Sequence, residues 1–248
     1  MRSVPDAIVL CGGAGSRLRT VTERAKAMVH IGDRPFLELP LRQLRRWGIS
    51  RVILAVGYQG DTIRDHFGPE AFGLQVLYSQ ESSPLGTGGA LRNAANLIES
   101  NTALVMNGDS YTDADLHRFE LHHDQSGADM SVVVVTPDGR EDCGFVSMDA
   151  SGKLLAFQEK QVHAAPKYIN AGVYLLSREI LLEIPVDMET SLEKELLPRW
   201  LEQGKHIRAT IDPATCHDIG TPERLRRAQT ALAEVETGHC PTASGVGL

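Results

Sequence analysis

A short apolar strand that runs directly into a glycine-rich loop constrains this chain more than any other stretch. Residues 7–11 (AIVLC) predict a buried strand, and residues 12–17 (GGAGSR) follow it without a spacer. Small residues let the backbone of a loop approach a ligand closely. Two cations, Arg17 and Lys26, come next, with a polar segment between them. Backbone N–H groups and fixed positive charge beyond a strand suit a polyphosphate, so we expect this loop to hold a nucleotide's phosphates.

Composition and charge restrict the partners of the chain. Of its 248 residues, 42% are hydrophobic and 23% are charged, which is ordinary for a globular protein. The net charge of −7 offers no basic field to nucleic acid or to an anionic membrane, so an anionic substrate needs a local cluster of cations. The N-terminal apolar run is too short for a signal peptide, and no stretch is long enough to span a bilayer. The four cysteines lack C-x-x-C spacing. We expect a soluble cytoplasmic protein.

Strand and helix patterns alternate through the first half of the chain. Strands are predicted at 51–58, 74–80, 103–106 and 131–136, with helices at 35–47, 90–99 and 115–125. Pro40 inside the first helix suggests a kink or a late start. Such alternation predicts right-handed crossovers and a mostly parallel sheet. A hairpin at 144–159 then changes the pattern. We expect an α/β fold with one domain over residues 1–237 and a disordered tail at 238–248.

Two common phosphate-binding loops do not fit the glycines. A P-loop requires Gly-Lys-Ser or Gly-Lys-Thr, and neither occurs in the sequence. A dinucleotide fingerprint requires a third glycine where this chain has Leu18, and the strand that ends near Tyr58 lacks an acidic residue for the ribose. A plain turn between strand and helix is the remaining simple interpretation. However, four glycine or alanine residues followed by two cations exceed what a turn needs.

The run Gly12-Gly13-x-Gly15-Ser-Arg17-Leu, with Lys26 after it, resembles the sugar-1-phosphate nucleotidyltransferases. The resemblance extends from residue 7 to about residue 232. Within this family the motifs PFLE (35–38), LAV (54–56), PLGTGGA (84–90) and NGD (107–109) most resemble those of the D-glycero-α-D-manno-heptose 1-phosphate guanylyltransferases. The family's loop lysine usually follows a proline, and here it follows Ala25. The resemblance implies a three-layer, Rossmann-like fold with a mixed, mostly parallel sheet flanked by helices.

The resemblance also implies a reaction in which a sugar 1-phosphate attacks the α-phosphorus of a nucleoside triphosphate and pyrophosphate leaves. The implied catalytic residues are Arg17, Lys26 and Asp109. The implied metal ligands are Asp109 and Asp218, since two carboxylates with phosphate oxygens suit Mg²⁺. Without the resemblance, Lys26 reads as a surface lysine and Asn-Gly-Asp as a turn. Cys216 and His217 suggest zinc instead, but no second ligand pair lies at zinc spacing.

The implied binding residues fall into two sets. Nucleotide contacts are expected at Leu10, Gly12, Gly13, Ala14, Gly15, Gln80, Gly86, Thr87 and Gly108. Among them, Gln80 offers an amide to a base edge, although it can equally be an ordinary strand-end residue. Sugar-phosphate contacts are expected at Gly144, Glu159, Lys160, Asn170 and Gly172. His122 and His123, adjacent on a predicted helix, are expected at the surface.

Several alternative functions remain open. Within the same class they are a mannose-1-phosphate guanylyltransferase and an N-acetylmuramate-1-phosphate uridylyltransferase, which typically has Glu-Thr-Gly-Gly where this chain has Gly86-Thr-Gly-Gly89. A non-catalytic nucleotide-sugar sensor would be expected to have lost a catalytic residue, and a nicotinamide-dependent oxidoreductase conflicts with Leu18. The sequence leaves the oligomeric state open.

Overall fold

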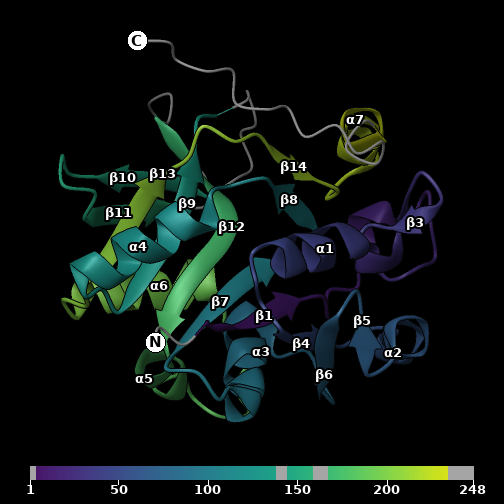
Figure 1. The fold of residues 1–248 in the computed structure, drawn as a ribbon, viewed down its shortest axis with the longest axis horizontal. Helices are drawn as coiled ribbons and strands as arrows, with labels where there is room; N and C mark the ends of the chain where they lie inside the picture. Colours follow the sequence, from purple (N-terminus) through teal and green to yellow (C-terminus); the bar gives the residue numbers. More distant parts are fainter. Residues whose placement is uncertain (1–3, 138–143, 159–166, 234–248) are drawn as a thin grey trace.

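A ten-stranded sheet forms the middle layer of the computed structural model, which describes residues 4–137, 144–158 and 167–233 (Figure 1). The main path runs in the order β11-β10-β12-β7-β1-β4-β6-β5, and β9 joins β12 to β13. The ladders among β7, β1, β4 and β6 are parallel. Those of β12 with β7, β9 and β10 are antiparallel. The sheet is therefore mixed: four neighbouring strands of the N-terminal half are parallel, and β13 pairs parallel with β9 on the other side of β12.

The elements have the following bounds. The strands are β1 (Asp6–Leu10), β2 (His30–Ile31), β3 (Arg34–Pro35), β4 (Arg51–Val56), β5 (Glu70–Ala71), β6 (Leu74–Gln80), β7 (Thr102–Asn107), β8 (Ser110–Thr112), β9 (Met130–Val135), β10 (Phe145–Met148), β11 (Leu154–Gln158), β12 (Tyr168–Ser177), β13 (Ile207–Ile211) and β14 (Cys216–Asp218). The α-helices are α1 (Glu38–Arg46), α2 (Gly60–Phe67), α3 (Gly86–Ala94), α4 (Leu116–Ser126), α5 (Arg178–Leu182), α6 (Leu197–Glu202) and α7 (Pro222–Ala233). Short 3₁₀ turns form η1 (Ser16–Leu18), η2 (Lys26–Met28) and η3 (Ala95–Leu97), and η4 (Leu192–Leu196) is a π-helix.

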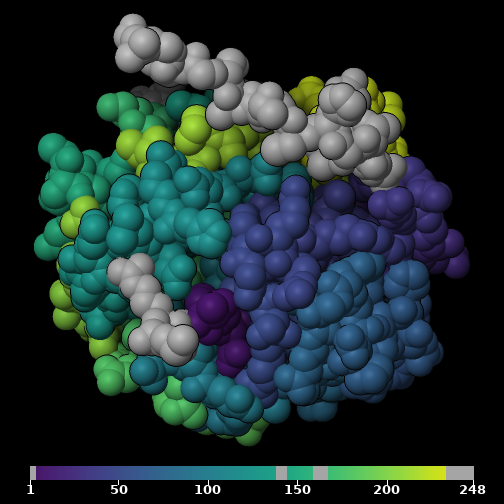
Figure 2. Space-filling model, in the orientation of Figure 1, coloured from purple at the N-terminus to yellow at the C-terminus, as the bar shows by residue number. Residues whose placement is uncertain are grey.

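Helices cover both faces of the sheet. Successive strand residues point to opposite faces. Ala7 and Val9 of β1 accordingly join one apolar core with α1, α2 and α4, while Ile8 joins another with α3, α5 and α6. In Figure 2 the blue surface of the N-terminal part packs directly against the teal and green surface of the later chain. The predicted three-layer α/β fold is confirmed.

The strand order reverses beside β1. The chain moves from β1 to β4 and β6 on one side, and later returns to β7 on the other side. The segments that follow β1 and β7 meet there, and the Gly108 N–H donates to the Leu10 carbonyl at 2.9 Å. Open α/β sheets bind ligands at such a switch point. The fold therefore brings the glycine loop beside Gly108 and Asp109.

A second, two-stranded sheet lies next to this point. Strands β8 and β14 pair antiparallel, with Asp218 opposite Ser110. The ladder continues beyond the strands, because the Ile219 N–H donates to the Asp109 carbonyl at 3.0 Å. A segment more than one hundred residues further along the chain thus joins the end of β7 through a pair of three-residue strands.

A third apolar core fixes this two-stranded sheet to the glycine loop. Figure 1 shows α7 beside β14. Leu18 comes from η1, Tyr111 from β8 and Ile219 from the residue after β14, and α7 adds Leu225, Ala228 and Leu232. The Arg224 N–H donates to the Thr221 hydroxyl at 3.3 Å, so Thr221 caps α7 as a side-chain acceptor. We call this set the α7 core.

The structure differs from the predicted elements in a few places. The first helix begins at Glu38, which puts Pro40 in the first turn, where the missing N–H costs no hydrogen bond. The strand predicted at 74–80 matches β6, whereas β8 and β14 were not predicted. No helix within the described ranges is long and apolar enough to cross a membrane. The single domain stays a prediction, and the expected tail at 238–248 lies outside the described residues.

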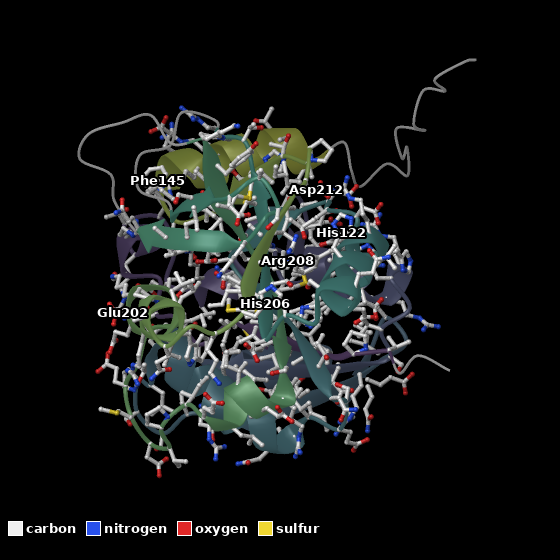
Figure 3. The ribbon with its side chains drawn as sticks, turned by 90° about the vertical axis from the view of Figure 1, so that its left-hand side faces the viewer. His122, Phe145, Glu202, His206, Arg208 and Asp212 are labelled. Carbon is white, nitrogen blue, oxygen red and sulfur yellow. The ribbon has the colours of Figure 1, made fainter. Side chains whose placement is uncertain are left out.

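His123 corrects the expectation of two surface histidines. His122 is exposed, and Figure 3 shows it on α4 beside Arg208 of β13. His123 is 5% exposed and its Nδ1 lies 2.8 Å from the Ser131 hydroxyl. Adjacent helical residues point in different directions, and α4 turns the second one toward the sheet. Burial lowers the pKa of His123, which favours the neutral ring.

We expect Leu18→Ala to destabilise the protein, because Leu18 is 1% exposed in the α7 core. A buried leucine cut back to alanine costs about 2–5 kcal/mol. Urea unfolding followed by circular dichroism measures the change. The control is Val21→Ala in the same loop, where the side chain is 56% exposed and the expected change is below about 0.5 kcal/mol. Equal stability of the two variants would show that Leu18 does not fix the loop.

Candidate active site

A cavity of about 630 Å³ opens at the switch point beyond β1 and β7. Most of the predicted nucleotide and catalytic residues line it: Leu10, Gly12, Gly13, Ala14, Lys26, Gly86, Thr87, Gly108 and Asp109. Gly13 and Ala14 are exposed, so their backbone can contact a ligand. The structure therefore brings together the glycine loop, the first turn of α3 and the end of β7.

Lys26 and Asp109 form an ion pair in the cavity. The lysine side chain is 13% exposed and the aspartate side chain is 40% exposed. Gly108 precedes the aspartate, and a Cβ there would lie 2.8 Å from the Leu10 carbonyl. Only glycine allows the chain to pass this close to β1 and to direct Asp109 toward the loop. Lys26 is thus held by a carboxylate and is not the solvated surface lysine of the simple interpretation.

Asp218 approaches the same place from β14. Its Oδ1 accepts a hydrogen bond from the Gly220 N–H at 2.9 Å and pairs with Arg224 of α7 at 3.2 Å. A Cβ built on Gly220 would lie 2.9 Å from this oxygen and 3.6 Å from Lys26 Nζ. The Lys26 ammonium therefore lies close to both aspartates, although Asp218 does not line the cavity itself. Sequence analysis did not identify Arg224, whose role depends on the fold of α7.

The two aspartates fit a divalent cation bound together with substrate. Within the described residues, no three His, Cys, Asp or Glu side chains are grouped to hold a metal. Mg²⁺ commonly uses one or two carboxylates and takes its remaining ligands from phosphate and water. Asp109 and Asp218, near a cavity that has room for phosphates, meet that requirement. The zinc alternative fits less well, because the Cys216 thiol is buried and directed to the Ala171 carbonyl at 3.8 Å.

The predicted catalytic residue Arg17 and the predicted nucleotide contacts Gly15 and Gln80 do not line the cavity. Arg17 lies exposed on η1, next to the buried Leu18. The Gln80 amide donates to the carbonyls of Gly57 and Glu81, at 3.4 and 3.2 Å. The Gln80 amide, which was expected to contact the base, is thus hydrogen-bonded to two backbone carbonyls instead.

Glu81, which sequence analysis missed, lines the cavity instead. Its Oε2 accepts a hydrogen bond from the Leu85 N–H at 3.2 Å, and its Oε1 lies against Gly12 and Gly57. A Cβ on Gly12 would lie 2.9 Å from that oxygen, so the glycine leaves room for the carboxyl group. Burial raises the pKa of Glu81. The available signal was its position as the first acidic residue after a strand that ends at the ligand-binding edge.

Of the predicted sugar residues, Gly172 lies beside the cavity, and Asn170 and Gly144 are joined to it through β12. The Asn170 N–H donates to the Gly144 carbonyl at 2.8 Å, which joins β12 to the start of β10. A Cβ on Gly172 would lie 2.8 Å from Asn107 Nδ2, and Asn107 lines the cavity. Glu159 and Lys160 lie outside the described residues. The structure therefore brings together three of the five predicted sugar contacts: Gly144, Asn170 and Gly172.

Comparison with known proteins places this chain in a family. The profile of the nucleotidyl transferase family matches residues 6–235. A mannose-1-phosphate guanylyltransferase of Mycobacterium tuberculosis is 36% identical over 92% of this chain, which spans 64% of that protein's length. A D-glycero-α-D-manno-heptose 1-phosphate guanylyltransferase of Campylobacter jejuni is 34% identical over 88% of this chain and 96% of its own. The crystal structure of HddC from Yersinia pseudotuberculosis complexed with GMP-PN is 31% identical, with a TM-score of 0.80 over 92% of this chain and 100% of that one.

We expect Asp109→Asn to weaken metal binding, because the amide keeps the shape of the side chain and loses its charge. Titration of the protein and GTP with Mn²⁺, followed by electron paramagnetic resonance, should show at least about tenfold weaker binding, equivalent to about 1.4 kcal/mol. Asp61→Asn on α2, where the side chain is 88% exposed, is the control and should not change the affinity. Equal Mn²⁺ affinity of both variants would contradict the assignment of Asp109 as a ligand.

Proposed function

Because the chain belongs to the nucleotidyl transferase family, we propose that it transfers a guanylyl group from GTP to a sugar 1-phosphate. An oxygen of the sugar phosphate attacks the α-phosphorus of GTP, the bond to the β-phosphate oxygen breaks, and pyrophosphate leaves. The observation that carries this proposal is the Lys26–Asp109 pair, beside Asp218, at the end of a glycine-lined cavity. We further propose that the enzyme acts in the cytoplasm.

The chemistry requires charge neutralisation and positioning. A phosphate monoester has a second pKa of about 6, so the attacking phosphate is already largely a dianion at neutral pH and needs no general base. Two anions must still be brought together while negative charge builds up on the leaving group. Lys26 can serve this purpose from the inner end of the cavity, and Arg17 from the exposed end of the glycine loop. Mg²⁺ held by Asp109 and Asp218 would supply further positive charge at the phosphates.

Glu81 supports guanine as the base. The Watson–Crick edge of guanine presents two adjacent donors, N1–H and N2–H₂, which match the two oxygens of a carboxylate. Uracil and thymine present one N–H between two carbonyl groups, which a carboxylate repels. Glu81 lines the cavity and accepts the Leu85 N–H just before the Gly86–Thr87 turn, and Gly12 and Gly57 leave space for its carboxyl group. A uridylyltransferase is therefore the weaker alternative.

We propose D-glycero-α-D-manno-heptose 1-phosphate as the sugar substrate. The relative from Campylobacter jejuni that bears this activity in its name matches the chain over 96% of its own length. Mannose 1-phosphate is the second candidate, because the mannose-1-phosphate guanylyltransferase of Mycobacterium tuberculosis is 36% identical to the chain.

A grid of pyrophosphate release tests the proposed function. GTP, UTP, dTTP, CTP and ATP are each combined with heptose 1-phosphate or mannose 1-phosphate, with and without Mg²⁺. We expect turnover with GTP and heptose 1-phosphate only when Mg²⁺ is present. Turnover with UTP or dTTP and none with GTP would refute the guanylyl assignment. Full activity after a chelator has removed divalent cations would refute the requirement for Mg²⁺.

We expect Glu81→Gln to lose discrimination for the guanine 2-amino group. Glutamine presents one acceptor and one donor, so one of the two guanine donors meets an N–H group. The loss of a hydrogen bond to a charged group, about 1.5–3 kcal/mol, corresponds to a fall in kcat/KM for GTP of about 10- to 150-fold. The ratio of kcat/KM for GTP to that for ITP, whose base lacks the amino group, should fall toward one.

The Gln80→Ala variant tests whether Glu81 or Gln80 contacts the base. Because the Gln80 amide contacts the Gly57 and Glu81 carbonyls, the variant should keep the preference for GTP over ITP. If Gln80→Ala loses the preference for GTP over ITP and Glu81→Gln keeps it, Gln80 and not Glu81 contacts the base.

A further inference from the structure

A hydrogen-bonded chain of four side chains runs from the nucleotide cavity to the predicted sugar residues. Thr87, which lines the cavity, donates to Glu193 Oε2 at 2.8 Å. Tyr174 donates to Glu193 Oε1 at 3.1 Å and accepts from Asn170 Nδ2 at 2.7 Å. Asn170 Oδ1 in turn accepts from the Gly172 N–H at 2.9 Å. We call Thr87, Glu193, Tyr174 and Asn170 the relay.

The middle of the relay is a polar group inside the core. Tyr174 is a large, fully buried side chain in the second apolar core. A buried hydroxyl costs free energy unless it is hydrogen-bonded, and phenylalanine would fill nearly the same space without that cost. Burial raises the pKa of Tyr174 far above its usual range, so the hydroxyl keeps its proton and donates. Each of the two carboxyl oxygens of Glu193 accepts a hydrogen bond from one hydroxyl group.

The Glu193 end of the relay is packed tightly onto the first turn of α3. Glu193 belongs to the π-helix η4, a rare geometry that is often found at functional sites. The Leu192 N–H donates to the Thr87 hydroxyl at 2.8 Å, and the Gly88 N–H donates to the Thr190 carbonyl at 2.7 Å. Gly86 has a φ of +68°, and a Cβ there would lie 2.6 Å from the same carbonyl. A ligand that fixes α3 at Thr87 therefore also fixes η4.

The Asn170 end lies next to the place where the second substrate must bind. Asn170 is adjacent to β10 through its bond to the Gly144 carbonyl. Gly172 lies against Asn107 and Ser110, between the cavity and the small β8–β14 sheet. A change in the orientation of the Asn170 side chain would therefore alter the proposed binding site of the sugar 1-phosphate.

We propose that the relay makes Glu193 a positioning residue that couples the two substrate sites. Nucleotide held against Thr87 fixes the Glu193 carboxylate, which aligns Tyr174 and Asn170 for the sugar 1-phosphate. This proposal rests on the proposed function, because it takes the occupants of both sites from it. Coupling between two binding sites is reciprocal, so each substrate raises the affinity for the other by the same factor.

Isothermal titration calorimetry tests the coupling directly. D-glycero-α-D-manno-heptose 1-phosphate is titrated into the full-length enzyme with Mg²⁺, in the presence and absence of the non-cleavable α,β-methylene analogue of GTP. For the unmodified protein, we expect the analogue to tighten binding at least about fivefold. In Glu193→Gln the factor should fall toward one, because the amide cannot accept both hydroxyls. Tyr174→Phe removes the same link without a polar replacement and should give the same result.

Glu195→Gln is the matched control on the same π-helix. Glu195 Oε1 accepts the Ser191 N–H at 2.9 Å, and glutamine can keep that bond, so the factor should stay at the value of the unmodified protein. The proposal is overturned if Glu193→Gln and Tyr174→Phe keep that value, or if the unmodified protein has a factor of one. Absence of pyrophosphate release by the unmodified protein would instead refute the proposed function.

Discussion

The pairing of β8 with β14 is the contact on which the reactive end of this molecule depends. It involves three residues on each side, and it places Asp218 opposite Ser110, one residue after Asp109. The Ile219 N–H on the Asp109 carbonyl extends the pairing. The segments that carry two mutually repelling carboxylates are thus held side by side. The Lys26 ammonium pairs with Asp109 and lies near Gly220, whose N–H binds Asp218. The repulsion is offset by that charge, by Arg224 and by the apolar contacts of the α7 core.

The nucleotide half of the site could be predicted because it is encoded locally. The strand, the glycine loop and Lys26 lie within twenty residues of one another, and β7 runs directly into Gly108 and Asp109. The parallel order of β7, β1 and β4 then follows from strand and helix alternation. Both signals are read from neighbouring residues. The fold class and the part of the cavity lining that the glycine loop and the end of β7 supply follow from them.

The remaining features depend on contacts that no local pattern records. Strands β8 and β14 are too short for a period of two to be recognised, and their partners are more than one hundred residues apart. The choice between Gln80 and Glu81 depends on the direction of each side chain at the end of β6. There the amide turns to the Gly57 carbonyl, and the carboxyl group turns into the cavity. Glu193 and Tyr174 become neighbours only through the packing of η4 on α3.

The position of α7 at the end of the described chain has a consequence for biosynthesis. A ribosome delivers the glycine loop first, Asp109 later, and Asp218 with α7 last of the three. The central ladders of β1 with β4, of β4 with β6 and of β1 with β7 need only the first 107 residues. Assembly during synthesis can therefore begin well before the charges at the reactive end are balanced. A chain interrupted before residue 216 would retain the nucleotide-facing loops and lack the second acid, so the site becomes whole only once β14 and α7 have been synthesised.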